Sequence, residues 1–124
     1  MSVFTELELA VLRSIFSETP EFASSLDQQR AVSTVTSRIN TGNGFFTSIS
    51  VGEEAPLVKC RSPLGGETNA RIHGLKHGLG FNLFMEGGRL HELEGFGWGE
   101  ESTSTLNFYW LKFEVYRQPF IHVR

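Results

Sequence analysis

Two glycines, Gly87 and Gly88, stand between two runs that favour extended chain, and this feature constrains the fold more than any other. Only glycine enters the positive-φ turns of tight hairpins without a steric penalty from a Cβ atom. The flanking runs, residues 78–86 and 89–99, carry the densest apolar sequence of the chain. We therefore predict that residues 78–99 form the central β-hairpin of a sheet.

The two arms of this hairpin differ in their apolar pattern. Phe81 and Leu83 share one face of an ideal strand, whereas Leu90 and Leu93 fall on opposite faces. A three-residue loop or a bulge after Gly88 would let Leu83 meet Leu93 across the hairpin. We favour a bulge, whose position the sequence leaves open.

The start of the chain has the pattern of an amphipathic helix. Thr5 followed three residues later by Glu8 is a capping box, which satisfies free N–H groups at a helix start. Behind it, apolar residues recur at helical spacing and form one face: Leu7, Val11, Leu12, Ile15 and Phe16. A second, short helix is expected to start at Pro20, with Thr19 as its N-cap, and to end near Arg30.

From residue 31 the pattern changes to strands. Residues 32–39 are rich in β-branched side chains, and a turn cluster at 40–44 leads into a partner strand at 45–51. The odd-numbered residues of that partner strand share one face. The serines on its other face predict contact with water.

Three further strands and a final run are expected. Residues 57–60 are a candidate edge strand within an irregular loop, and 69–75 is a strand that precedes the hairpin. Residues 106–115 give the strongest strand signal, because both faces are apolar in the first half, as in a strand covered on both sides. A short final run follows at 120–123.

These elements predict a single α+β domain spanning residues 1–124. Two N-terminal helices are expected to pack on one face of a mostly antiparallel sheet of five to six strands. A chain of 124 residues is long enough to bury a core without metal or disulfide staples.

Composition excludes several kinds of partner. The net charge is −3 and the eleven basic residues are spread thinly, whereas nucleic-acid binding needs a concentrated positive face. No apolar run approaches the roughly 20 residues that span a bilayer. The first residues also lack the basic and apolar regions of a signal peptide. We therefore expect a cytoplasmic protein that binds neither nucleic acid nor a membrane.

Cys60 is the only cysteine, which fits a reducing compartment. Its basic neighbours, Lys59 and Arg61, could lower its pKa and activate the thiol. The interpretation that we favour is a buried or incidental thiol.

Glu92 and Glu94 are the candidate catalytic pair. Two residues apart on a strand, they should point to one face with Cα atoms roughly 7 Å apart. That separation suits paired-carboxylate chemistry. The alternative, which we favour, is a solvated or structural pair whose charges are met by Arg38, Arg71 or Lys112.

Three histidines, His73, His77 and His91, raise the question of a metal site. Two histidines four residues apart converge simply only on a helix, and Gly74 and Gly78 deny a helix there. We therefore expect no metal. No phosphate-binding loop, dinucleotide fingerprint, nucleophile elbow or Cys-x-x-Cys pair occurs, so we expect no cofactor.

Aromatic residues supply the candidate ligand or partner contacts. Phe96 and Trp98 stand between glycines, where they either reach a partner or complete the core. Trp110 lies in the apolar run 106–115. Two short helices cover only part of a sheet, so we expect some of this run to stay exposed and to form a homodimer centred on Trp110. Another protein could bind the same residues.

Two stretches resemble a small family of uncharacterised bacterial proteins. The family pairs a TGxGFFT element with a later GFxLF…GRLxxLEG hairpin, and this chain has TGNGFFT at 41–47, GFNLF at 80–84 and GRLHELEG at 88–95. The resemblance spans most of the chain and implies no activity. Small proteins of this type include some bacterial immunity proteins, an association at the level of the fold.

The sequence therefore predicts a non-enzymatic cytoplasmic domain that binds a ligand or a protein. The alternative is a small hydrolase-type enzyme that uses Glu92 and Glu94 in a cleft lined by Trp98.

Overall fold

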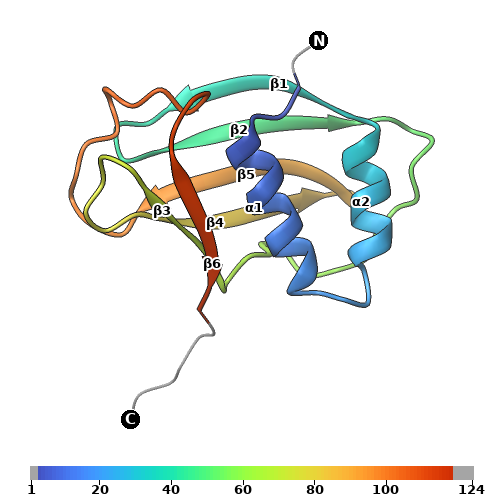
Figure 1. Ribbon diagram of the computed structural model, residues 1–124. Coiled ribbons are helices and arrows are strands. Elements are labelled where there is room, and N and C mark those ends of the chain that lie inside the picture. The colour runs from blue at the N-terminus through green and yellow to red at the C-terminus, as the bar shows by residue number, and fades with distance from the viewer. Residues whose placement is uncertain (1–2, 119–124) are drawn as a thin grey trace.

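The structure is a computed structural model that describes residues 3–118, so the final run expected at 120–123 lies outside the described residues. Two helices precede six strands (Figure 1): α1 Glu6–Ser17, α2 Ala23–Ala31, β1 Ser33–Asn40, β2 Gly44–Val51, β3 Thr68–Ile72, β4 Leu79–Glu86, β5 Arg89–Gly97 and β6 Phe113–Arg117. Neither helix has the length and apolar character that a membrane span requires.

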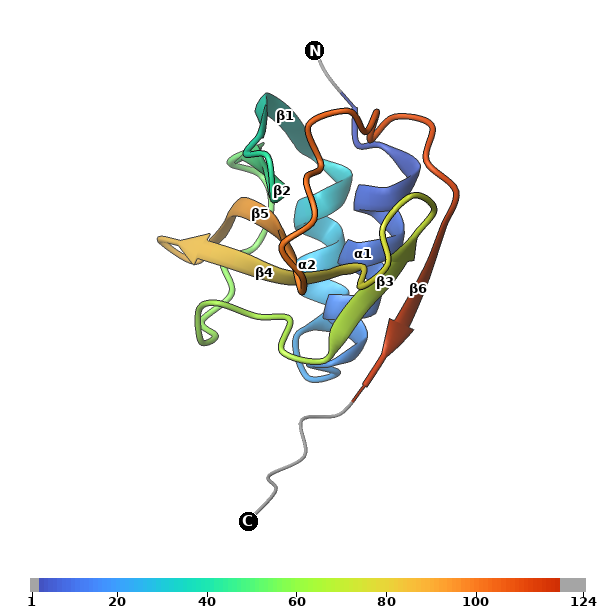
Figure 2. The same cartoon turned by 90° about the vertical axis from the view of Figure 1, so that its left-hand side faces the viewer.

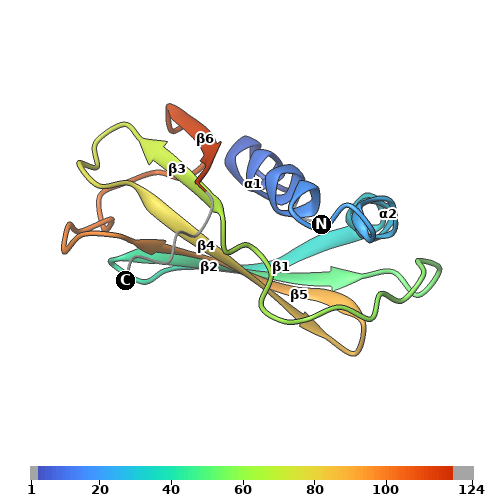
Figure 3. The ribbon, with the colours of Figure 1, turned by 90° about the horizontal axis from the view of Figure 1, so that it is seen from below.

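All neighbouring strands pair antiparallel, in the order β1-β2-β5-β4-β3-β6. Both helices lie on one face of the sheet, here called the inner face (Figure 3). The sheet curls at its far edge so that β6 lies beside α1. The predicted α+β architecture, with two N-terminal helices on one face of the sheet, is confirmed.

The hairpin of β4 and β5 occupies the centre of the sheet, as predicted. Gly87 and Gly88 form its turn with φ values of 60° and 79°, the signs that a tight two-residue turn requires. Leu83 lies opposite Leu93. The register shifts beyond Phe84, so that His91 is the extra residue of a bulge on β5. The predicted bulge is confirmed, and its place is His91.

Helix α1 begins as predicted. The Thr5 hydroxyl accepts a hydrogen bond from the Glu8 N–H (3.1 Å), and the Glu8 carboxylate accepts one from the Thr5 N–H (2.8 Å). The expected apolar face is buried against the sheet: Leu7, Val11, Leu12, Ile15 and Phe16. Together with Leu26 of α2 and the inner-face residues of the strands, it forms one core.

Helix α2 begins later than predicted. We expected Thr19 to cap a helix starting at Pro20, but the helix starts at Ala23. The Thr19 hydroxyl instead donates to the Phe16 carbonyl at the end of α1, and the Phe22 N–H closes a turn on the Thr19 carbonyl. The chain therefore uses Thr19 to end the first helix, and α2 starts without a side-chain cap.

The buried side chain of Gln29 connects α2 to the sheet through hydrogen bonds. Gln29 has no solvent exposure, and its amide donates to the carbonyls of Pro56 and Gly88, each at 2.8 Å. Its carbonyl oxygen accepts from the Leu90 N–H at 2.9 Å. Buried polar groups are tolerated when they are fully hydrogen-bonded, so Gln29 positions α2 over the tip of the central hairpin.

The strand predicted over 106–115 is wrong in its first half. Only Phe113–Arg117 is a strand, β6, and it pairs with β3. Residues 98–112 form a connecting segment that passes the start of α1 on its way to β6 (Figure 2). Within it the Tyr109 N–H donates to the Asn107 side chain and the Trp110 N–H to the Asn107 carbonyl, which turns the chain away from a strand.

Of the other predicted strands, one is shorter than expected and one does not form. The strand predicted at 69–75 spans Thr68–Ile72 and ends where the Leu75 N–H turns back to the Ile72 carbonyl. Residues 57–60 form no strand; only the Val58 N–H bonds to the hairpin, at the Gly88 carbonyl.

Candidate functional site

The face of the sheet opposite the helices, here called the outer face, has no element of residues 3–118 packed over it (Figure 3). On β2 the buried residues Phe45, Thr47 and Ile49 point inward, so Phe46 and Ser48 point outward. Cross-strand pairing extends this assignment to β5 and β4, whose outward side chains are Glu92, Glu94, Phe96, Asn82 and Phe84.

Carboxylates and aromatic rings alternate on the outer face. Phe46 lies beside Glu94, and Glu92 lies beside Phe84 on the other neighbouring strand. Both carboxylates border an open hollow of about 510 Å³ that His91 and Phe84 also line. Glu92 and Glu94 therefore share one face, as predicted.

The partners that we expected for these carboxylates lie elsewhere. Arg38 pairs with Glu8 (2.8 Å) and Arg71 with Glu114 (2.7 Å). Glu94 accepts one hydrogen bond, from the Asn82 amide at 3.1 Å. Among residues 3–118, no basic side chain pairs with either glutamate. The interpretation that we favoured allowed a solvated pair or an ion pair; the described residues form no such ion pair, and both carboxylates border the open hollow of the outer face.

Phe96 and Trp98 also lie on the outer face. The two rings pack edge to face, with 5.0 Å between their centres. Both rings lie over Gly80, where a Cβ atom would come within 2.5 Å of the Phe96 ring. The Trp98 indole N–H donates to the Asn69 side chain at 2.8 Å. This bond fixes the ring while leaving Trp98 59% exposed. The two residues cover the sheet from outside and do not complete the core.

The three histidines lie in two places, the turn between β3 and β4 and the strand β5. His73 and His77 lie in the turn between β3 and β4, and the exposed imidazole of His91 approaches Glu86 at 3.1 Å. In the part of the chain that the structure describes, no three His, Cys, Asp or Glu side chains are placed to share a metal ion. Burial raises the pKa of the Cys60 thiol, with Arg61 acting in the opposite direction, so its basic neighbours do not activate it.

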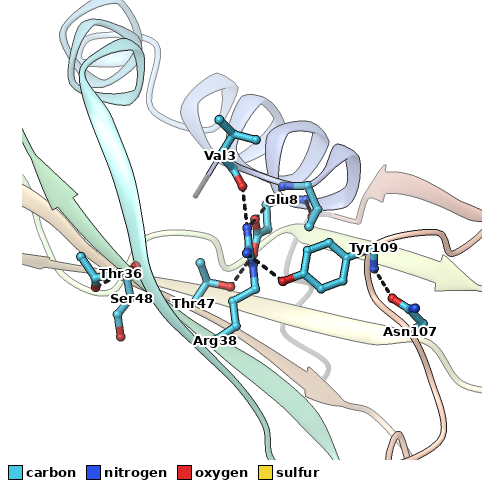
Figure 4. A network of polar contacts seen from close by, with 9 residues as sticks. Val3, Glu8, Thr36, Arg38, Thr47, Ser48, Asn107 and Tyr109 are labelled. Carbon is cyan, nitrogen blue, oxygen red and sulfur yellow. Dashed lines mark hydrogen bonds and ion pairs between the residues drawn. The ribbon is translucent and has the colours of Figure 1, made fainter. Parts of the chain in front are cut away.

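A second polar centre, which we did not predict, lies on the inner face (Figure 4). Arg38 of β1 donates from Nε and Nη2 to the two carboxylate oxygens of Glu8, at 2.9 and 2.8 Å. The Thr47 hydroxyl donates to the same carboxylate at 2.5 Å. Only 3% of the Glu8 side chain and 19% of the Arg38 side chain are exposed. This is a nearly buried ion pair between the first helix and the edge strand.

Burial alone would raise the pKa of Glu8. The hydrogen bonds from Arg38, Thr47 and the Thr5 N–H outweigh that effect and hold the pKa below its usual value. A sequence signal for this centre exists. Glu8 precedes Val11, Leu12 and Ile15 by three, four and seven residues, so it shares their apolar face, where a carboxylate needs a partner.

Arg38 also binds the connecting segment. Its Nη1 donates to the Tyr109 hydroxyl at 3.1 Å, and its guanidinium lies 5.1 Å from the centre of the Tyr109 ring. Between α1, β1 and this segment lies a cavity of about 470 Å³, here called the Arg38 pocket, lined by Thr5, Leu7, Glu8, Arg38, Ile39, Asn40, Phe45, Leu106, Asn107, Phe108 and Tyr109.

The predicted contact residues fall on opposite faces of the sheet. Phe96 and Trp98 are on the outer face, whereas Trp110 adjoins Tyr109 at the rim of the Arg38 pocket. Trp110 is 79% exposed and Tyr109 is 56% exposed. The structure therefore presents two separate candidate surfaces and does not join them into one site.

In comparisons with known proteins, no protein-family model, curated protein or solved structure matches the chain.

Proposed function

We propose that this chain is a non-enzymatic, cytoplasmic interaction domain that binds a basic protein surface through the outer face of its sheet. The observation that carries the proposal is the uncovered outer face, where aromatic rings flank two carboxylates that face solvent. The lone cysteine, Cys60, suits the reducing conditions of the cytoplasm.

The chemistry of the outer face suits arginine and lysine side chains. A cation can lie over an aromatic ring such as Phe46 or Phe84 while it pairs with the neighbouring carboxylate. Trp98 adds an exposed ring held in a fixed orientation, which is the kind of residue that dominates protein interfaces. An immunity-type role, in which the domain covers the surface of a toxin, is one form of this proposal.

The enzyme alternative has less support. A hydrolase acting through Glu92 and Glu94 needs an enclosed cleft that excludes water and shifts the pKa of one carboxylate. Here the pair stands on an open face, in a hollow bordered by exposed His91 and Glu86. This arrangement favours binding over catalysis.

The test is a titration with two short peptides, acetyl-Arg-Trp-Arg-amide and acetyl-Glu-Trp-Glu-amide, followed by amide chemical shifts. We expect the basic peptide to shift amides of β2, β5 and β4 and the acidic peptide to shift none of them. The double substitution Glu92→Gln and Glu94→Gln should weaken binding at least about fivefold, as lost charged hydrogen bonds would.

A matched control uses Glu53→Gln with Glu54→Gln, two exposed carboxylates in the loop after β2. This variant removes the same net charge and should bind as the wild type does. Equal losses in the two double variants would show a diffuse charge effect and would refute a site on the outer face.

Self-association is a second candidate, and it concerns the other surface. Tyr109 and Trp110 are exposed beside the Arg38 pocket, and large exposed aromatic side chains in a cluster mark interfaces. The outer face is unsuited to this role, because two copies meeting there would bring carboxylates toward carboxylates. We therefore assign the homodimer to the Tyr109–Trp110 surface.

A further inference from the structure

We propose that the Arg38 pocket binds a small uncharged molecule that has an apolar body and a carbonyl oxygen. The proposal does not depend on the function assigned to the outer face, because the pocket lies on the opposite side of the sheet.

The walls of the pocket suit an apolar body. Leu7 of α1, Phe45 of β2, and Leu106 and Phe108 of the connecting segment line it. Phe108 packs against Phe45 at 4.9 Å between ring centres, so two of these walls are aromatic and mutually supported. A cavity of about 470 Å³ lies within the range of ordinary ligand sites, roughly 300 to 1,000 Å³.

The hydrogen-bond acceptors of the pocket are already occupied. The carboxylate of Glu8 accepts four bonds, from the Thr5 N–H, two Arg38 nitrogens and the Thr47 hydroxyl. A carboxylate offers about four acceptor positions. The side-chain oxygen of Asn40 accepts from the Gly42 N–H and the Thr103 hydroxyl.

Donors remain unused in the same pocket. The Tyr109 hydroxyl accepts from Arg38, but within residues 3–118 its own hydrogen has no acceptor. The side-chain oxygen of Asn107 accepts from the Tyr109 N–H, and its NH₂ group has no acceptor within the same residues. Arg38 uses four of its five N–H groups. A ligand with an acceptor oxygen would therefore find three donors in this pocket, on Tyr109, Asn107 and Arg38.

Charge decides which acceptor fits. Glu8 neutralises Arg38 inside the pocket wall, so the site has no net positive charge to offer a carboxylate. An anionic ligand would also approach the Glu8 carboxylate, and like charges at partly buried sites repel strongly. A neutral carbonyl group meets the donors without that repulsion.

The experiment compares three probes of similar shape: 4-phenylbutan-2-one, butylbenzene and 4-phenylbutanoate. Each is titrated into the full chain while amide chemical shifts report the binding site and the dissociation constant. We expect the ketone to give saturable shifts at residues 38–40 and 106–109. Its affinity should exceed that of the other two probes by about three- to tenfold, as one extra hydrogen bond would provide.

Two variants test the donors. Tyr109→Phe should weaken ketone binding about three- to tenfold and leave butylbenzene binding unchanged. Asn107→Asp keeps the oxygen that accepts from the Tyr109 N–H but replaces the NH₂ group, so it should also weaken the ketone selectively. Tyr116→Phe is the matched control, because Tyr116 lies on β6 with its ring against Arg71 on the outer face.

Three results would overturn the inference. They are equal affinity of the ketone and butylbenzene, tighter binding of the carboxylate, and no saturable shift at the pocket up to the solubility of the ketone. The peptide titration of the outer face reads out different amides, so a failure of either proposal is distinguishable from a failure of the other.

Discussion

At the scale of single residues, Glu8 links three parts of the molecule. Its carboxylate caps the first turn of α1, pairs with Arg38 of β1 and accepts a hydrogen bond from the Thr47 hydroxyl of β2. Removing one partner of a buried ion pair leaves the other charge without compensation, which costs more than the pair itself contributes. Glu8 is therefore the position at which a minimal chemical change should matter most.

We predict that Glu8→Gln lowers the free energy of unfolding by about 3 kcal/mol, because Arg38 stays buried without a counter-charge. Urea denaturation of the variant and the wild type measures the change. Glu6→Gln is the matched control, since Glu6 is an exposed carboxylate in the same helical turn, and it should change stability little. A loss of less than about 1 kcal/mol in Glu8→Gln would show that the pair contributes only as a surface ion pair does.

The same carboxylate predicts an acid limb of stability. The folded-state pKa of Glu8 is lowered from its usual value of 4.5. Stability from this group is therefore complete above about that pH and is lost as the pH falls through the lower, folded-state pKa. Denaturant midpoints measured between pH 6 and pH 3 should fall more steeply in the wild type than in Glu8→Gln. Parallel curves would contradict the assignment. The hydrogen bond from Arg30 also lowers the pKa of Asp27. Asp27 is present in both proteins, so its contribution to the pH dependence cancels in the comparison.

At the scale of elements, the connecting segment 98–112 is held by Thr103. This residue is fully buried, and its hydroxyl accepts from the Gly44 N–H at 2.9 Å and donates to Asn40 at 3.0 Å. Its backbone bonds to Gly42 and to the Asn40 amide. The turn between β1 and β2 therefore positions the segment that forms one wall of the Arg38 pocket.

We predict that Thr103→Val destabilises the fold by about 2 kcal/mol, because the buried Gly44 N–H loses its acceptor while the side-chain volume is kept. Hydrogen exchange should also become faster across residues 98–112. Ser104→Ala is the matched control, since Ser104 is exposed and, within residues 3–118, its side chain bonds only to Ser102. Unchanged exchange in Thr103→Val would show that other contacts hold the segment.

The sequence predicted elements where local pattern and tertiary environment agree. The parity conflict between Leu90 and Leu93 indicated a bulge because only the inner face of the hairpin is buried, and the bulge at His91 resolves it. Residues 106–112 were predicted as a strand because of their apolar pattern, but the tertiary structure gives that pattern another cause. Phe108 packs inward on Phe45 while Trp110 points to solvent, so their apolar character reflects a core contact and an exposed surface, not a covered strand.

The candidate sites were predictable to different degrees. The shared face of Glu92 and Glu94 follows from strand alternation, which is a local rule. The ion pair between Glu8 and Arg38 depends on the approach of α1 to β1, and no local spacing encodes that approach. Its one sequence signal is the placement of a carboxylate on the apolar face of the first helix.

At the scale of the whole molecule, the exposed aromatic residues predict a dimer. Trp110 and Tyr109 lie next to each other at the rim of the Arg38 pocket, which residues from the start of α1 also line. We predict a dimer mass for the wild type by light scattering at micromolar concentration and a monomer mass for Trp110→Ala. Trp98→Ala, which removes an exposed indole from the outer face, should remain dimeric. A monomeric wild type would contradict the interface.

The strands of the sheet do not all pair over the same length, and β3 depends more on β6 than on β4. Strand β3 pairs with β4 at only two positions, Asn69 and Ala70, but with β6 along its full length from Thr68 to Ile72. During synthesis on the ribosome, β6 emerges after every other strand. Until then one edge of β3 has no partner, and unpaired edges recruit other chains. The interval between translation of β3 and β6 is therefore the period in which a nascent chain most needs protection by a chaperone.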